Sequence, residues 1–282
     1  MANKDLTVIV TTFKSENRID ECLNSIERNI RVIVVENSNN KKFKEYIENK
    51  FSNSECILSN DNLGYGKGNN IALNKVKTKY CLILNPDALL EKKAIDNFFS
   101  FLEKKINFAI LGPNQNEKDF YLKKTDFNNV VDIKEVNSIK GFAMFLNMKK
   151  FSKIGFFDEN IFLYLEEIDL CKRIKNINEK IFIDPSIKIF HSGGKSVNNL
   201  FFQQIELTRN WHWMWSLFYY NKKHFNYFYA LFLICPNFFS AIIKIFLYTI
   251  FFNNKKKKIY QKRLSGLFNS ILLRPSWYRP KI

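Results

Sequence analysis

Three carboxylates stand close together in the largely apolar stretch LYLEEIDLC, residues 163–171. The pattern from Glu166 onward predicts a helix, on which Glu166 and Asp169 share a face and Asp169 can pair with Arg173 four residues later. Glu167 lies on the other side, because the residues three, four and seven positions after it are apolar: Leu170, Cys171 and Ile174. Glu167 is therefore either a surface group where the apolar stripe ends or a general base aimed into a cleft.

Asp87 follows the apolar run CLIL in the stretch LILNPDALL. It is either the cap of a following helix or a ligand of a Mg²⁺ or Mn²⁺ ion that bridges a diphosphate, with Asn85 as a water-mediated partner. His191 ends the run IKIFH, beside Gly193 and Gly194. It is either a structural histidine or a second ligand that completes a metal site with Asp87.

Two further segments carry residues suited to a nucleotide. Glu36 ends the run RVIVVE, and its carboxylate could accept the imide N–H of uracil or thymine, although the following NSNN is also ordinary turn chemistry. The segment NDNLGYGKGNN, residues 60–70, combines alternating glycines with asparagines: Gly64, Gly66, Gly68, Asn62, Asn69 and Asn70. It predicts either a flexible turn or close backbone approach to a nucleotide or diphosphate.

These residues must be positioned by the elements around them. Short β-branched runs alternate with helical patterns, which is typical of β-α-β units in a mostly parallel sheet, where ligands bind beyond the carboxyl ends of the strands. The expected strands are 6–12, 31–36, 56–60 and 80–85, and the expected helices are 16–29, 41–50, 67–76, 91–104 and 166–177. Residues 106–150 have an irregular pattern with a buried element at 141–147, and residues 180–191 predict two short strands broken at Pro185.

The last 80 residues differ in composition. Residues 211–282 hold 12 of the 44 Lys and Arg residues and none of the 27 Asp and Glu residues. The first 210 residues therefore hold 32 basic and 27 acidic residues, so most of the net charge of +17 belongs to the tail. The 19 uncharged residues of 225–243 approach the length that spans a bilayer, but they include Pro236. We expect two helices joined at residues 235–237 that lie in a membrane interface; a spanning helix, or packing on the first domain, is the alternative.

The bulk properties limit the remaining choices. We predict a domain at 1–200 and a cationic, aromatic-rich membrane-association region at 201–282. Five cysteines without a C-x-x-C pair indicate a reducing cytosol, and residues 1–13 lack the long apolar run of a signal peptide. The lysines alternate with long apolar runs, a pattern that suits a lipid surface better than a nucleic acid.

The motifs together resemble the family 2 glycosyltransferases of GT-A fold, in particular their rhamnosyltransferase-like branch. The resemblance covers about residues 6–196 and rests on the order and spacing of these motifs: VIVTTF, VVENSNN, NLGYGKGNN, LNPD, GFFDENIFLYLEEIDLCKR and HSGGKS. It implies an α/β, Rossmann-like GT-A domain with a C-terminal helical tail that associates with a membrane. Three departures are Asn-Pro-Asp where Asp-x-Asp is common, Glu36 and Glu167 where aspartate is common, and Phe156 where glycine is frequent.

The resemblance also implies roles for individual residues. Glu167 is expected to be the general base, with Glu166 and Asp169 shaping the acceptor side. Asp87 and His191 are expected to hold Mg²⁺ or Mn²⁺. The residues expected to line the nucleotide and donor site are Thr11, Thr12, Phe13, Glu36, Asn62, Gly64, Tyr65, Gly66, Asn69, Asn85 and Asp87.

The function expected from these observations is inverting transfer of a sugar from dTDP-rhamnose or a UDP-hexose to a hydroxyl of a lipid-linked or oligosaccharide acceptor. It would occur at the inner face of the cell membrane, in polysaccharide biosynthesis for a bacterial cell envelope. The alternative is a nucleotide-sugar-binding scaffold, weak in catalysis, within a membrane complex that assembles glycans.

Overall fold

The computed structural model describes residues 5–114, 132–191 and 201–280, and its residue contacts divide the chain into two units. The first, here called the sheet unit, comprises residues 1–63, 67–157 and 167–197. The second, here called the helical unit, comprises residues 64–66, 158–166 and 198–282. Gly193 and Gly194, which follow the candidate ligand His191, lie outside the described residues.

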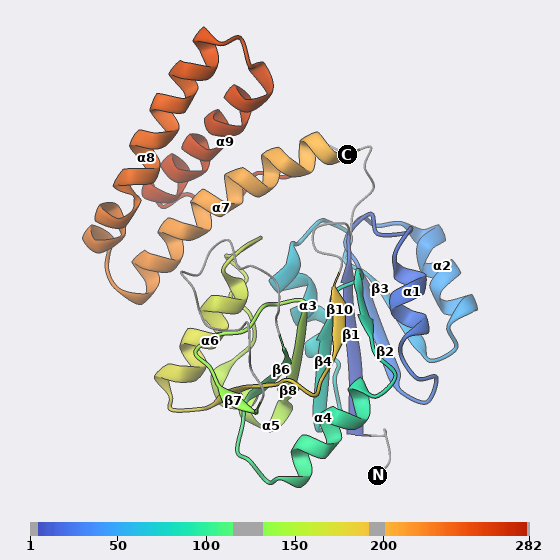
Figure 1. Ribbon diagram of the computed structural model, residues 1–282. Coiled ribbons are helices and arrows are strands. Elements are labelled where there is room, and N and C mark those ends of the chain that lie inside the picture. Colours follow the sequence, from blue (N-terminus) through green and yellow to red (C-terminus); the bar gives the residue numbers. More distant parts are fainter. Residues whose placement is uncertain (1–4, 115–131, 192–200, 281–282) are drawn as a thin grey trace. The chain divides into compact units, whose positions relative to one another are not determined.

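Four parallel strands form the first half of the sheet unit (Figure 1). They are β1 (Leu6–Thr12), β2 (Arg31–Glu36), β3 (Ser54–Leu58) and β4 (Tyr80–Leu84), in the order β3-β2-β1-β4. The helices between and after them are α1 (Ile19–Asn24), α2 (Lys41–Lys50), α3 (Tyr65–Leu73) and α4 (Ala94–Glu103). The central strands are buried along nearly their whole length, which is why their sequences are continuous β-branched runs rather than alternating ones.

The second half extends the sheet in mixed directions. Strand β8 (Ala143–Asn147) pairs antiparallel with both β4 and β6 (Ile110–Pro113), and β6 pairs parallel with β9 (Ile181–Asp184). The short β7 (Lys134–Glu135) closes the order β3-β2-β1-β4-β8-β6-β9-β7, and α5 (Met148–Ile154) follows β8. The prediction of a mostly parallel α/β sheet is confirmed, and the irregular region 106–150 contributes two of its buried strands.

A small second sheet brings two distant segments of the sheet unit together. Strand β5 (Ala88–Leu90) pairs antiparallel with β10 (Ile189–His191), and the register places Ala88 opposite His191. The two strands predicted on either side of Pro185 are confirmed as β9 and β10. The helix-cap interpretation of Asp87 is wrong, because a strand rather than a helix follows this residue.

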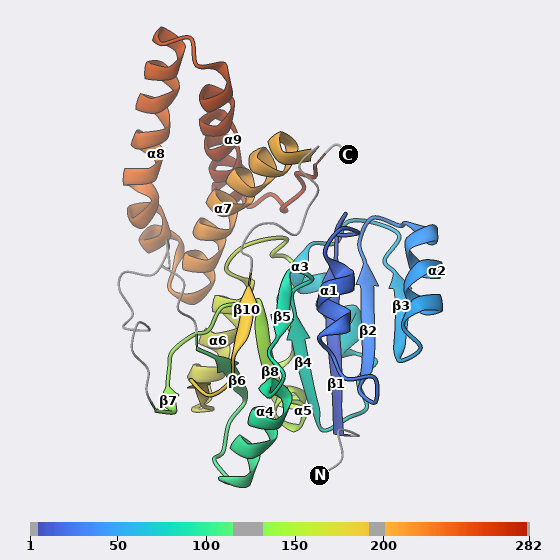
Figure 2. The same cartoon turned by 45° about the vertical axis from the view of Figure 1, so that its right-hand side comes forward.

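The helical unit contains three long helices, α7 (Phe202–His224), α8 (Tyr227–Ile250) and α9 (Asn254–Ile271) (Figure 2). A buried cluster joins all three: Met214, Phe218, Ala230, Ile234 and Leu267. Gly266 allows α9 to touch the backbone of α7, since a Cβ atom at this position would lie 2.1 Å from the Trp211 carbonyl oxygen. Asn226 and Asn253 cap α8 and α9 through their side-chain oxygens.

The predicted break at residues 235–237 is wrong, because α8 continues through Pro236. A proline inside a helix removes one backbone hydrogen bond and costs on the order of 3 kcal/mol. Packing offsets this cost: α9 runs antiparallel along α8, as shown by ring contacts of Phe238 with Phe268 and of Tyr248 with Tyr260, both at 5.7 Å between centroids.

One side of α8 is exposed and apolar. The large side chains that share this exposure are Phe228, Tyr229, Phe232, Leu233, Phe239, Ile242, Ile243, Phe246, Leu247 and Ile250. Among the described residues, α8 is the one helix long and apolar enough to cross a membrane, and only 17% of its most apolar window is buried. Such a helix in an aqueous protein would bury its apolar residues, so this side of α8 lacks cover from the described residues of the helical unit.

Candidate active site

Asp87 and His191 are brought together by the pairing of β5 with β10. The Asp87 Oδ1 atom lies 3.3 Å from the His191 Nε2 atom, and the two side chains are 2% and 14% exposed. The imidazole stacks on the Phe142 ring with 4.5 Å between centroids, which fixes its plane. The sequence prediction that these two residues are neighbours is therefore confirmed by the geometry.

This pair fits a divalent cation. Asp87 Oδ1 is buried without a hydrogen-bond partner among the described residues, although it is close to the imidazole. A buried carboxylate oxygen of this kind needs a cation or a donor. In the part of the chain that the structure describes, no group of three or more His, Cys, Asp or Glu side chains could hold a metal. A cation here would depend on phosphate oxygens and water for its other ligands, as Mg²⁺ commonly does.

Glu36 is buried at the carboxyl end of β2, where its carboxylate holds the loop that follows. One oxygen accepts hydrogen bonds from the backbone N–H and the hydroxyl of Ser38, and the other accepts from the Asn40 N–H at 2.7 Å. A carboxylate offers about four acceptor positions. Three of these are used within the protein, so a base would have to share the carboxylate with this turn.

The end of β1 contacts the start of α3. Thr11 Oγ1 donates to Asn69 Oδ1 at 2.8 Å, and Thr12 Oγ1 donates to the Val35 carbonyl at 3.3 Å. Helix α3 begins at Tyr65, so Gly66 and Gly68 are helical residues rather than parts of a loop. A Cβ atom at Gly68 would lie 2.7 Å from Thr11 Cγ2, which shows that this glycine permits close packing of α3 on the end of β1.

The neighbouring predicted residues have backbone or protein partners. The Phe13 N–H donates to Ser15 Oγ at 3.3 Å, and the Asn85 N–H donates to the Phe142 carbonyl at 2.8 Å. Asn70, the last asparagine of the glycine-rich segment, exchanges two hydrogen bonds with the backbone of Phe157, at 2.9 and 3.0 Å. Its buried amide thus fixes the chain just before the acidic cluster.

In the helical unit, Gly64 and Tyr65 contact the backbone of Phe162. The Tyr65 N–H donates to the Phe162 carbonyl at 3.2 Å, and a Cβ atom at Gly64 would lie 2.1 Å from that same oxygen. Gly64 also has a φ of +80°, a conformation that glycine adopts readily. Asn62, at the end of the sheet-unit segment before it, is partly exposed.

The acidic cluster begins helix α6 (Glu166–Asn176), as predicted. Asp169 is fully buried and accepts from Arg173 Nε at 3.0 Å. Arg173 also donates to the carbonyl oxygens of Ile154 and Phe156, so this ion pair fixes the GFFDE turn. Glu166 is 5% exposed and Glu167 is intermediate, while the apolar stripe after Glu167 is buried. The predicted pairing of Asp169 with Arg173 is confirmed, and the role of Glu167 stays a prediction.

Sequence reasoning missed the loop of residues 158–165, which belongs to the helical unit and comes just before Glu166. Tyr164 and Leu165 have φ values of 70° and 68°, and neither is a glycine. Asp158 accepts from Tyr219 at 2.9 Å and from Lys223 at 2.7 Å. Burial opposes the charge on Asp158, but these bonds and the Asn160 N–H outweigh it and lower its pKa to about 2. The sequence contains Asp158 and Lys223 but does not show that they pair, because they are 65 residues apart.

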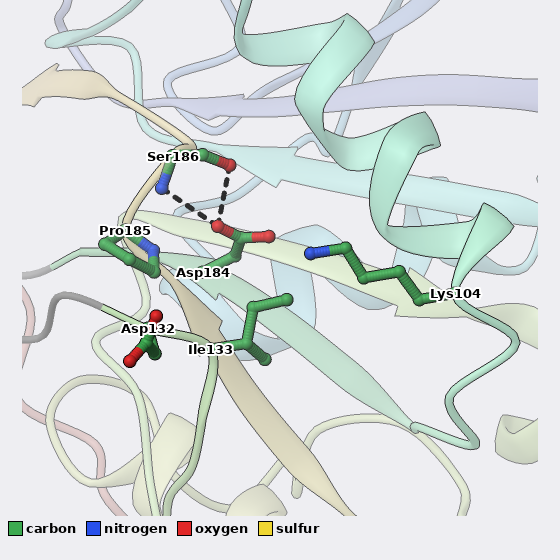
Figure 3. A pocket seen from close by; sticks show the side chains of 6 residues that line it. All are labelled: Lys104, Asp132, Ile133, Asp184, Pro185 and Ser186. Atoms are coloured by element: carbon green, nitrogen blue, oxygen red, sulfur yellow. Dashed lines mark hydrogen bonds between the residues drawn. The ribbon is translucent and has the colours of Figure 1, made fainter.

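A separate cavity of about 610 Å³ lies at the end of β9 in the sheet unit (Figure 3). Its lining residues are Lys104, Asp132, Ile133, Asp184, Pro185 and Ser186. Asp184 accepts hydrogen bonds from the Ser186 N–H and hydroxyl, and the Lys104 ammonium points toward it in Figure 3. Its carboxylate is thus occupied in closing the turn after β9, and we assign this cavity no part in the chemistry.

The cysteines form no disulfide, and four of the five are buried: Cys22, Cys56, Cys81 and Cys171. Burial raises the pKa of Cys171 and of Cys56 to about 12 in each case. A buried thiol with a raised pKa is a poor nucleophile. The site chemistry therefore rests on the carboxylates and the imidazole.

The mostly parallel α/β sheet, with a buried carboxylate beyond its fourth strand, is consistent with the GT-A fold of glycosyltransferases. The chain belongs to glycosyl transferase family 2, since the sequence profile of that family matches residues 7–173.

Two relatives have more specific names. Over 198 residues the chain is 26% identical to the low-salt glycan biosynthesis hexosyltransferase Agl10 of Haloferax volcanii; the match covers 63% of this chain and 64% of Agl10. Over 202 residues it is 26% identical to the rhamnosyltransferase WbbL of Escherichia coli K12, covering 61% of this chain and 76% of WbbL. The chain thus spans less than two thirds of Agl10.

Solved structures support the fold. The mannosyltransferase PcManGT of Pyrobaculum calidifontis, in complex with GDP-mannose and Mn²⁺, superposes with a TM-score of 0.59 at 13% identity, covering 95% of this chain and 87% of that one. S. aureus TarS superposes with a TM-score of 0.54 at 14% identity, covering 94% of this chain and 55% of TarS. The predicted GT-A fold is confirmed.

Proposed function

We propose that the chain is an inverting, metal-dependent glycosyltransferase that moves a sugar from a nucleotide diphosphate donor to a hydroxyl of a glycan acceptor. The pairing of buried Asp87 with His191 is the observation that carries this proposal, because it offers a carboxylate and an imidazole as metal ligands beyond the carboxyl end of β4. A Mg²⁺ or Mn²⁺ ion held by Asp87 and His191 would supply positive charge that stabilises the departing diphosphate. The naming of two relatives as a hexosyltransferase and a rhamnosyltransferase supports the reaction class.

The protein side of the reaction needs one general base. Glu167 accepts the proton of the acceptor hydroxyl while the oxygen forms its bond to the anomeric carbon, and the bond from that carbon to the diphosphate breaks on the opposite face. A single displacement of this kind inverts the anomeric centre and needs no covalent intermediate. Glu166 and Asp169 are proposed to shape the acceptor side, with Asp169 held by Arg173.

The donor side is assigned to the ends of β1, β2 and β4 and the start of α3. Thr11, Thr12, Phe13 and Glu36 are proposed to hold the nucleoside. Its base would be uracil or thymine if the Glu36 carboxylate accepts a hydrogen bond from the imide N–H. The remaining donor-side residues are Asn62, Gly64, Tyr65, Gly66, Asn69 and Asn85. The donor is then dTDP-rhamnose or a UDP-hexose.

The helical unit is proposed to hold the enzyme on a membrane surface that carries a lipid-linked acceptor. The exposed apolar side of α8 would enter the headgroup region, and the cations of α8 and α9 would meet anionic lipids: Lys244, Lys255, Lys256, Lys257, Lys258, Lys262 and Arg263. Lying in the interface is favoured over spanning, because α9 packs along α8 and would carry Lys262 and Arg263 into the hydrocarbon with it. The proposed location is the inner face of the cell membrane, in the synthesis of cell-surface polysaccharide.

The test is a mass-spectrometric screen. The full-length protein is incubated with Mn²⁺, a panel of UDP-, dTDP- and GDP-sugars, and lipid-linked glycans extracted from the source organism. We expect one donor to give an acceptor heavier by one sugar residue, and no product when EDTA replaces Mn²⁺. A protein that binds a nucleotide sugar but extends no acceptor would instead be the nucleotide-sugar-binding scaffold.

A further inference from the structure

We infer that the C-terminal segment of residues 274–280 is a positioning element for the 158–165 loop, with Arg279 as its principal contact. This inference rests on the proposed transferase function, because the loop leads directly into Glu166 and Glu167 at the start of α6. None of the sequence motifs includes this segment, which begins more than a hundred residues after Glu166 and Glu167.

The loop has a backbone that must be held in place. Tyr164 and Leu165 are consecutive residues in the left-handed region, immediately before the helix begins. Side chains with a Cβ atom, and bulky ones above all, adopt this region rarely, and the conformation persists only where surrounding contacts determine it. The contacts that hold this loop therefore also hold the backbone that leads into Glu166.

Helix α7 supplies the first set of contacts from a single face. His212, Ser216 and Tyr219 follow one another at helical spacing, and Lys223 extends the same row. Ser216 Oγ donates to the Leu163 carbonyl at 2.9 Å, and the His212 ring lies 4.4 Å from the Phe162 ring. Together with the two bonds to Asp158, these contacts fix both ends of the loop on α7.

The C-terminal segment supplies the second set. Ser276 Oγ donates to the Asn160 carbonyl at 2.8 Å. The Arg279 guanidinium lies 3.8 Å from the centroid of the Phe162 ring, a short cation–π distance. Arg279 Nη1 also donates to the Ser276 carbonyl at 2.6 Å, so one side chain closes its own segment and covers the loop.

The segment is itself anchored on α7. Trp215 Nε1 donates to the Arg274 carbonyl at 3.0 Å, and His212 Nε2 lies 2.6 Å from the Tyr278 carbonyl oxygen. Phe162 is consequently in contact with both His212 and Arg279, while its own carbonyl accepts from Tyr65. Arg279 thus acts on a residue that contacts the donor-side Tyr65 and precedes the acceptor-side acids by only a few positions.

Two measurements on Arg279→Ala test this inference, with Arg274→Ala as the matched control. Arg274 is an exposed arginine of the same segment whose side chain forms no hydrogen bond or ion pair with the described residues. In hydrogen exchange of the full-length protein, we expect amides 160–167 of Arg279→Ala to exchange about tenfold faster than in the parent, and those of Arg274→Ala to match the parent. Ser276→Ala, which removes only the bond to Asn160, should give a smaller change in the same amides if Arg279→Ala is too unstable to measure.

The kinetic measurement separates positioning from general stability. We expect kcat of Arg279→Ala to fall about tenfold, since small misplacement of a catalytic group is costly, while its Kd for UDP with Mn²⁺ changes less than twofold. Unchanged exchange, or faster exchange with unchanged kcat, would overturn the inference. If the parent makes no product with any donor, the proposed function fails, whereas the exchange data still decide whether Arg279 holds the loop.

Discussion

The sheet unit and the helical unit differ in how many large apolar side chains they expose. Among the described residues of the sheet unit, the exposed large apolar side chains are Tyr46, Ile177 and Phe190, which are far apart in the sequence. The helical unit exposes a continuous series along α8, ending at Phe251 and Phe252, beside the lysines of α9. A core that closes on itself suits a catalytic domain in water. An uncovered apolar face beside cations suits a surface that receives a membrane.

The largest effect is expected from removing the proposed base in the sheet unit. Glu167→Gln keeps the size of the side chain but cannot accept the acceptor's proton, so kcat should fall by about 10²- to 10⁴-fold with little change in nucleotide binding. Steady-state transfer assays measure this. Glu45→Gln, an exposed acid on α2, is the control, and equal activity of the two variants would exclude Glu167 as the base.

A second change targets the packing of the helical unit alone. In Gly266→Ala the new methyl group meets the Trp211 carbonyl on the backbone of α7, and we expect a loss of about 3 kcal/mol in unfolding free energy. Denaturant titration followed by tryptophan fluorescence measures it. Gly112→Ala in β6, where the nearest atom is the flexible end of Ile139, should cost less than about 1 kcal/mol. Equal losses in both variants would contradict the packing of α9 on α7.

A third change makes the exposed side of α8 less apolar. Replacing Phe232 and Phe246 together by serine should weaken binding to vesicles that contain anionic lipid by about 100-fold, since each buried phenyl ring contributes roughly 1.5–3 kcal/mol. Co-sedimentation with vesicles measures it, and Phe190→Ser provides an exposed phenylalanine of the sheet unit as the control. If the double variant sediments as the parent does, α8 is not the lipid-binding face.

The smallest effect concerns acid sensitivity in the helical unit. Burial lowers the pKa of His212 from 6.5 to about 3, so the unfolded chain binds a proton between these values that the folded protein excludes. This contribution to stability is present above pH 6.5 and is lost as pH falls toward 3; at pH 5 the loss is about 2 kcal/mol. Unfolding titrations at pH 7 and pH 5 should show a drop that His212→Asn lacks. A drop of the same size in both proteins would contradict the assignment.

The two units also differ in how far the sequence predicts them. Apolar runs and helical spacing predicted the parallel strands, the residues at their ends and the pairing of Asp169 with Arg173, because these depend on local patterns. The proximity of His191 to Asp87 was predicted only as a possibility, because the pairing of β5 with β10 that creates it is a long-range event.

Long-range packing explains most of what local patterns could not predict. Pro236 suggested a break in the tail, but contacts with α9 maintain the helix through it. Local patterns also could not show that Gly64 accommodates Phe162 and that Gly68 accommodates Thr11. The left-handed pair Tyr164 and Leu165 has no sequence signal at all, since neither residue favours that conformation.

The most direct test of the central claim is a calorimetric titration of UDP into the full-length protein with and without Mn²⁺. Asp87→Asn is the test variant and Asp96→Asn, an exposed acid on α4, is the control. We predict that Mn²⁺ strengthens UDP binding at least tenfold in the parent and in Asp96→Asn but not in Asp87→Asn. The same gain from Mn²⁺ in Asp87→Asn would contradict the assignment of Asp87 and His191 as the metal-binding pair of a nucleotide-sugar transferase.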